Sequence, residues 1–131
     1  MGKYDLFQGD VHLVEMATEH IERNFKPNQH HAASIIKTQT GLIYKALHLD
    51  IRGFDICGEA VALSAMMADD KCSEIDTVVT VLKQGMITKV INPCGNCRQM
   101  ILQYSPNAFV IVENSGELSR IPIKDLLPYP Y

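Results

Sequence analysis

Three of the four cysteines are spaced as ligands of one metal ion. Cys94 and Cys97 form a Cys-x-x-Cys pair, Cys57 stands far upstream, and Cys72 stands alone. The Cys94/Cys97 pair and Cys57 each stand at the start of a predicted helix, where the N-terminal amides stabilise thiolates. Three thiolates leave the fourth tetrahedral position of Zn²⁺ for water, which is the arrangement of a catalytic zinc site.

A closed structural zinc site is the alternative, because Cys-x-x-Cys is common in such sites. That site needs a fourth ligand from the chain. None of the candidates pairs with Cys57 at the short spacing that zinc knuckles use. Spacing alone leaves both interpretations open, and the candidates for a fourth ligand are His12, His20, His30, His31, His48 and Cys72.

Glu59 follows Cys57 by two residues, at the start of the same predicted helix. A carboxylate in that place can face a metal-bound water without reaching the metal, as a proton shuttle requires. The alternative is a first-turn glutamate that only favours the helix dipole. Cys-x-Glu followed by Pro-Cys-x-x-Cys favours the shuttle, because it matches the zinc deaminase signature with cysteine in the first position.

Arg98 comes directly after Cys97. Three thiolates leave a Zn²⁺ site with a net charge of −1, which weakens its power to acidify water. A cation nearby would offset that charge, so Arg98 is a candidate to hydrogen-bond the thiolates. A solvated arginine on a helix is the alternative.

The elements before these motifs are predicted from periodicity and turn composition. Residues 10–24 carry apolar side chains at helical spacing after a possible cap at Asp10. Two apolar runs at 32–36 and 42–49, separated by a turn composition at 38–41, predict a hairpin. The chain then enters a predicted loop at 52–55.

The second half alternates between helices and strands. Residues 58–69 are apolar on nearly every side and predict a helix packed in the core. Strands are predicted at 75–82, 86–91 and 109–113, and helices at 94–104 and 123–127. This order favours one α/β layered domain over residues 1–131, with helices covering a mixed sheet.

Composition narrows the functional classes. The 131 residues are 47% hydrophobic, and no stretch approaches the ~20 apolar residues that cross a bilayer. The net charge of −3 and the scattered basic residues disfavour nucleic-acid binding. The N-terminus lacks a hydrophobic signal core, and the cysteine pattern fits a compartment that keeps thiols reduced, so we expect a cytoplasmic protein.

The chain resembles the cytidine deaminase family in two motifs. Cys57-Gly58-Glu59 is similar to its Cys-Ala-Glu element, and Pro93-Cys94-Gly95-Asn96-Cys97-Arg98-Gln99 is similar to its Pro-Cys-Gly-x-Cys-Arg-Gln element. The resemblance implies a three-layer α/β/α fold with a central mixed sheet of about five strands and a homotetramer or homodimer. It also implies a zinc cofactor, hydrolytic attack at C4 of a pyrimidine, and protonation of N3 and then of the departing ammonia by Glu59.

On the substrate side this chain departs from the family. Family members hold the ribose with an Asn-x-Glu pair, where this chain has His48-Leu49-Asp50. The loop from Asp50 to Cys57 is short and similar in length to that of blasticidin S deaminases. The resemblance implies that His30 stacks on the base; the alternative is a polar residue at a strand start. For His48 the alternative is an ordinary strand-end residue. The resemblance also implies that Tyr129 or Tyr131 closes a neighbouring subunit's pocket, and the alternative is an unanchored tail.

These observations predict a zinc-dependent deaminase of a free cytosine nucleoside, such as cytidine, deoxycytidine or blasticidin S. Its partners would be a small-molecule pyrimidine nucleoside and copies of itself, with neither nucleic acid nor membrane. Two alternatives remain open at this point: a deaminase of bases in nucleic acids, and a non-catalytic structural zinc module.

Overall fold

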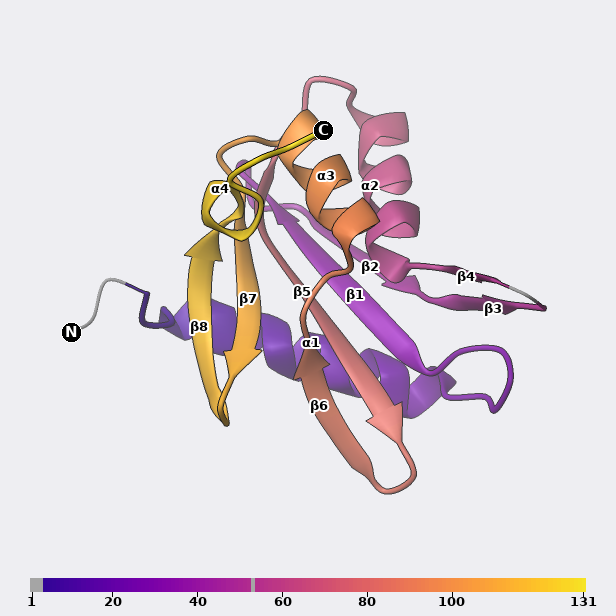
Figure 1. The fold of residues 1–131 in the computed structure, drawn as a ribbon. Coiled ribbons are helices and arrows are strands. Elements are labelled where there is room, and N and C mark those ends of the chain that lie inside the picture. The colour runs from indigo at the N-terminus through magenta and orange to yellow at the C-terminus, as the bar shows by residue number, and fades with distance from the viewer. Residues whose placement is uncertain (1–3, 53) are drawn as a thin grey trace.

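The computed structural model describes residues 4–52 and 54–131, and its centre is a mixed sheet. Five strands follow the order β2-β1-β5-β7-β8, and β6 pairs with β5 beside this path. The pair β5–β7 is parallel and the other pairs are antiparallel. In Figure 1 the helix α1 lies behind the sheet, while α2 and α3 lie in front of it. The predicted three-layer α/β/α fold is confirmed.

The helix α1 (Gln8–Asn24) covers one face of the sheet. Its buried side chains Leu13, Ala17 and Ile21 pack with apolar residues of the central strands β1 (Ala32–Thr38) and β5 (Ile75–Gln84). These residues recur at helical spacing, so one stripe of the helix meets the sheet and its charged faces meet solvent.

The opposite face is covered by α2 (Gly58–Asp69), α3 (Gly95–Tyr104) and the short helix α4 (Ile123–Leu126). Ala62, Leu63 and Met66 of α2 and Ile101 of α3 belong to one buried cluster with β1, β5 and β7 (Phe109–Asn114). Both faces of β1 and β5 are therefore covered, which explains why these strands are nearly continuous apolar runs.

The predicted hairpin is present as β1 and β2 (Ile43–Leu47), and the predicted strand at 86–91 is present as β6 (Ile87–Ile91). Two elements differ from the expectation. Of the predicted loop at 52–55, Phe54 and Asp55 lie instead in β4 (Phe54–Ile56), which pairs with β3 (Leu49–Ile51) in a second, largely exposed hairpin; residue 53 lies outside the described residues. The strand β8 (Glu117–Pro122) was not predicted, because its polar and apolar residues alternate only briefly before Pro122.

Asp10 is not the N-cap of α1, as the sequence suggested. The helix begins earlier, and Asp10 Oδ2 accepts a hydrogen bond from the backbone N–H of Phe7 at 2.9 Å. Its other oxygen, Oδ1, lies 3.0 Å from Nη1 of Arg120 on β8. Asp10 therefore joins the helix start to the unpredicted strand.

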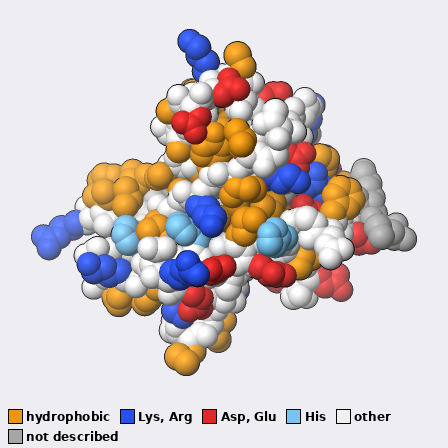
Figure 2. Space-filling view, turned by 180° about the vertical axis from the view of Figure 1, so that it is seen from behind, with side chains coloured by type: hydrophobic (Ala, Val, Ile, Leu, Met, Phe, Trp, Pro, Cys, Tyr) orange, Lys and Arg blue, Asp and Glu red, His pale blue; other side chains and the backbone are white. Residues whose placement is uncertain are grey.

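The face that carries α1 is seen in Figure 2. Acidic, basic and histidine side chains are interspersed there with apolar ones, and the described part of this face shows no continuous basic stripe. None of the helices in the described residues combines the length and apolar character needed to cross a membrane.

Candidate functional site

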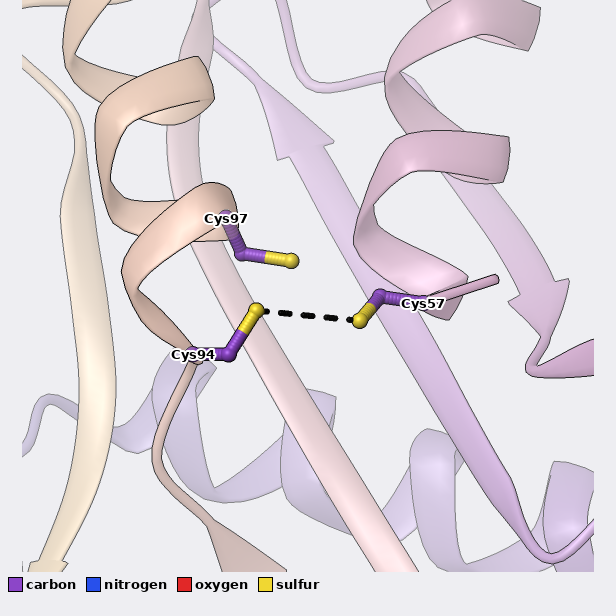
Figure 3. A group of neighbouring side chains, drawn as sticks. All are labelled: Cys57, Cys94 and Cys97. Atoms are coloured by element: carbon purple, nitrogen blue, oxygen red, sulfur yellow. Dashed lines mark hydrogen bonds between the residues drawn. The ribbon is translucent and has the colours of Figure 1, made fainter. Parts of the chain in front are cut away.

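The starts of α2 and α3 bring three thiols together. Cys57 is the N-cap of α2, Cys94 is the N-cap of α3, and Cys97 lies in the first turn of α3. The three Sγ atoms lie within 4.8 Å of one another, and those of Cys57 and Cys94 are 3.8 Å apart. Figure 3 shows the three side chains pointing toward one another from the two helices.

The environment of these thiols suits a cation. Burial raises the pKa of Cys57. Burial also raises the pKa of Cys97, and the nearby Glu59 carboxylate adds to that effect. Burial opposes ionisation of Cys94 as well, yet hydrogen bonds from the Cys97 backbone N–H and the neighbouring thiols lower its pKa. A bound divalent cation deprotonates coordinating thiols outright, so this donor set fits a thiolate-preferring metal such as zinc.

No fourth protein ligand joins the three sulfurs among the described residues. None of the histidines weighed above converges on them, and Cys72 is exposed beyond the end of α2. A closed structural zinc site takes four protein ligands, whereas a catalytic site keeps one position open. The geometry therefore favours the catalytic interpretation.

Glu59 lies in the first turn of α2 and is only 5% exposed. Its Oε1 accepts a hydrogen bond from Ser34 Oγ at 3.2 Å. A surface glutamate that only serves the helix dipole would be solvated, so burial argues against that alternative. Glu59 lines the same pocket as Cys57 and Cys94.

Arg98 makes different contacts from those expected. Its Nε donates to the carbonyl of Pro93 at 2.9 Å, and its Nη1 donates to the carbonyl of Leu126 at 3.1 Å. These bonds tie the residue that precedes Cys94 to α4. Among the hydrogen bonds of the described residues, none joins this guanidinium to a thiol, and its role as charge partner stays a prediction.

His48 and Asp55 line the wall of the pocket on the side of the β3–β4 hairpin. His48 is 5% exposed, and its Nδ1 accepts from the backbone N–H of His31 at 3.4 Å. Nε2 therefore carries the hydrogen. The Nε2 atom lies 3.5 Å from Asp55 Oδ1. Within the described residues, it is the one buried side-chain polar atom without a hydrogen-bond partner. His48 thus offers a donor to the pocket.

The cluster of His31, His48 and Asp55 also has the residue types of a metal site, with ligand atoms within 4.8 Å of one another. The Nδ1 of His48 is occupied as an acceptor, so its Nε2–H has no lone pair for a cation. We therefore interpret this cluster as a hydrogen-bonding surface.

The other predicted substrate residues lie elsewhere. His30 is half-buried and its Nδ1 donates to the carbonyl of His48 at 2.9 Å, so it supports His48, while the adjacent His31 lines the pocket. Asp50 is exposed on β3, directly opposite Asp55. Tyr129 and Tyr131 are exposed, and the backbone N–H of Tyr131 donates to Gln99 on α3. The proposed substrate roles of these residues stay predictions.

Sequence reasoning missed Asp55, Ser34 and Thr80, and it considered His31 only as a zinc ligand; these residues line the pocket or bond to Glu59. A signal existed for two of them. Ser34 and Thr80 are polar residues within apolar runs of β1 and β5, and a buried hydroxyl requires a partner. For His31 and Asp55 no sequence signal was available, because their contacts depend on the β3–β4 hairpin.

Comparison with known proteins points in one direction. The model of the cytidine and deoxycytidylate deaminase zinc-binding region matches residues 8–113. The blasticidin-S deaminase of Bacillus cereus is 34% identical over 138 positions, which cover 100% of this chain and 98% of that protein.

Solved structures agree at the level of the fold. The cytidine deaminase of Bacillus anthracis superposes with a TM-score of 0.78 at 22% identity, covering 95% of this chain and 90% of that one. The cytidine deaminase of Burkholderia pseudomallei gives a TM-score of 0.73, also at 22% identity, over 96% of this chain and 100% of that one.

Proposed function

Because the chain belongs to the cytidine and deoxycytidylate deaminase family, we propose that it removes the 4-amino group of a free cytosine nucleoside by hydrolysis. It is an enzyme of the zinc-dependent deaminase class, and zinc is its cofactor. The observation that carries the proposal is the convergence of Cys57, Cys94 and Cys97 beside the buried carboxylate of Glu59.

In this proposal the three cysteines hold the metal and Glu59 moves the protons. Bound zinc supplies a Lewis acid that acidifies water. The Glu59 carboxylate takes a proton from the attacking water and delivers it to N3 of the ring as the water oxygen forms a bond to C4. It then transfers the second water proton to the 4-amino group, the C4–N bond breaks, and ammonia leaves with a carbonyl formed at C4. Arg98 supports this site by fixing the Pro93 carbonyl next to Cys94.

His48 and Asp55 line the pocket beside the β3–β4 hairpin, so we assign them to the substituent at N1 of the pyrimidine. Nε2–H of His48 donates a hydrogen bond to this substituent, and the Asp55 carboxylate accepts one from it. Asp50 adds a second negative charge on the same hairpin. His30 acts through His48, whose carbonyl it bonds. The identity to the Bacillus cereus enzyme supports a modified cytosine nucleoside such as blasticidin S as the preferred substrate.

Self-association is a further part of the proposal. The outward side of α2 carries apolar and small side chains, although a helix that is apolar all round is normally buried. We propose that this face packs against another copy, in a homotetramer or homodimer, where Tyr129 or Tyr131 can approach a neighbouring pocket. Light scattering on the purified protein would measure the assembly. The residues at this face are Ile56, Ala60, Val61, Ser64, Ala65 and Ala68.

A cytoplasmic location belongs to the same proposal, because three free thiols must stay reduced to bind zinc. Deamination of bases in nucleic acid is the less supported function, since the net charge is −3 and the basic residues are scattered along the sequence.

Turnover of a substrate panel tests the reaction. Zinc-loaded protein is incubated with blasticidin S, cytidine, deoxycytidine and cytosine, and ultraviolet absorbance and ammonia release are followed. We expect turnover of at least one nucleoside, with blasticidin S the best. Glu59→Gln should lower kcat by about 10²- to 10⁴-fold with zinc retained, because the proton carrier is lost.

The matched control is Glu117→Gln, which makes the same change at an exposed position on β8 and should retain full turnover. Absence of turnover on every nucleoside, or an unchanged rate in Glu59→Gln, would contradict the proposal.

A further inference from the structure

Ser34 and Thr80 form a pair of buried hydroxyls beneath the start of α2. They lie directly opposite each other on β1 and β5, so their side chains share one face of the sheet. Their oxygens are 2.6 Å apart, and both residues are at most 5% exposed. Ser34 Oγ also donates to Glu59 Oε1. The two hydroxyls therefore form a chain that ends on the Glu59 carboxylate.

The direction of these hydrogen bonds follows from the number of hydrogens that each group can donate: one from each hydroxyl and none from the carboxylate. A carboxylate only accepts, so the single hydroxyl hydrogen of Ser34 goes to Glu59. The bond between the two hydroxyls must then be donated by Thr80. Thr80 thereby orients Ser34, and Ser34 engages Oε1, which assigns proton transfer to the other oxygen, Oε2.

Gly58 makes room for this hydroxyl. A Cβ at position 58 would lie 2.7 Å from Ser34 Oγ and 3.2 Å from Ser34 Cβ. Atoms do not pack that closely, and Ser34 is fully buried and bonded on two sides. A side chain at 58 and a hydroxyl at 34 therefore exclude each other. Glycine is a poor helix former, so its presence in the first turn of α2 has a steric reason.

We propose that Ser34 is a positioning residue that holds the Glu59 carboxylate in its reactive orientation, with Thr80 directing it and Gly58 giving it space. This inference rests on the proposed function, because the orientation of Glu59 matters to the rate only if Glu59 carries protons. Ser34 does not belong to the described pocket lining, so it acts through Glu59 and not on the substrate.

Ser34→Ala tests the hydrogen bond. Hydrogen bonds to charged groups are the stronger ones, and a misplaced catalytic group slows the reacting complex more than it weakens binding. We expect kcat to fall roughly 10- to 100-fold, with KM within about 2-fold of wild type and zinc content unchanged. Steady-state kinetics and metal analysis measure the three quantities.

Ser105→Ala is the matched control. Ser105 is also fully buried, and its Oγ accepts from the backbone N–H of Ile75 at 2.9 Å. It lies past the far end of α3, a ten-residue helix away from Cys94. This variant should lose stability and keep its kcat.

The double variant Ser34→Ala/Gly58→Ala separates positioning from packing. Gly58→Ala alone should lower both the melting temperature and kcat, because its Cβ displaces the Ser34 hydroxyl. Adding Ser34→Ala removes the 2.7 Å clash and leaves the contacts of 3.2 Å to Cβ and 3.4 Å to the backbone N of residue 34, which a small shift relieves. We expect the melting temperature to recover while kcat stays at the level of Ser34→Ala.

Recovery of kcat in the double variant would overturn the inference, because it would show that Ser34 only fills space. An unchanged kcat in Ser34→Ala would overturn it as well. If Gly58→Ala does not fold, the comparison of Ser34→Ala with the double variant carries the test. Failure of the proposed function is distinguishable, since it is seen as absence of turnover in the wild type before any variant is made.

Discussion

Cys94 and Cys97 lie within one turn of each other at the start of α3, so their proximity follows from local structure. Cys57 reaches them from another helix, 37 residues upstream of Cys94. Cys72 has the same chemistry but does not belong to this group. What distinguishes three of the thiols is a shared position at two helix N-termini, where thiolates are stabilised.

Cys94→Ala should therefore lose the metal and all turnover, because two sulfurs do not make a tight zinc site. Cys72→Ala should keep both. Metal analysis of the purified proteins, with zinc expected at one equivalent in wild type, measures the difference. Equal zinc content in the two variants would contradict the assignment of the ligands.

At the scale of elements, β8 holds the start of α1 to the sheet. Arg120 is 8% exposed and contacts Asp10 of α1 and Thr77 of β5. Its guanidinium carbon also lies 4.9 Å from the ring centroid of Phe7 and 4.0 Å from that of Phe109. A buried charge needs such partners, so the loss of one partner leaves the other uncompensated.

Arg120→Met should lower the free energy of unfolding by about 3–5 kcal/mol, because the buried Asp10 carboxylate loses its cation. Urea denaturation followed by circular dichroism measures it. Arg23→Met is the control: Arg23 pairs with Glu19 on the exposed side of α1, where ion pairs contribute little. Equal unfolding free energies for both variants would show that the buried pair does not stabilise the protein.

At the scale of the whole molecule, a metal held by Cys57, Cys94 and Cys97 would link α2 to α3 over the same face of the sheet. The two helices come from distant parts of the chain, and both pack on one buried cluster. A ligand that binds only the folded protein stabilises it by mass action.

Chelation should accordingly lower the melting temperature by about 10 °C, and added zinc should restore it. Differential scanning fluorimetry with and without a chelator measures the shift. The variant Cys57→Ala, which lacks one of the proposed ligands, should melt at the same temperature with or without chelator. A wild-type melting temperature that ignores the chelator would speak against a shared zinc site.

The sequence by itself determined the elements whose signals are local. Apolar periodicity predicted α1, a run that is apolar on nearly every side predicted α2, and the two Cys motifs placed their thiols at the starts of α2 and α3. Local signals failed where an element is short and exposed or closes onto a distant partner. The β3–β4 hairpin and β8 are of this kind, and so is the ion pair of Asp10 with Arg120, which lies 110 residues away.

The spacing of the cysteines predicted that Cys57, Cys94 and Cys97 share one metal site, and the fold brings their sulfurs together. Only the tertiary structure decided what surrounds them. Neighbouring histidines alternate in direction, so packing chose His31 over His30 for the pocket wall. Contact across two strands and a helix start decided that Ser34 meets Glu59 and that position 58 has no room for a side chain. Residue type and spacing specify which groups are present, whereas packing between distant segments specifies which of them touch.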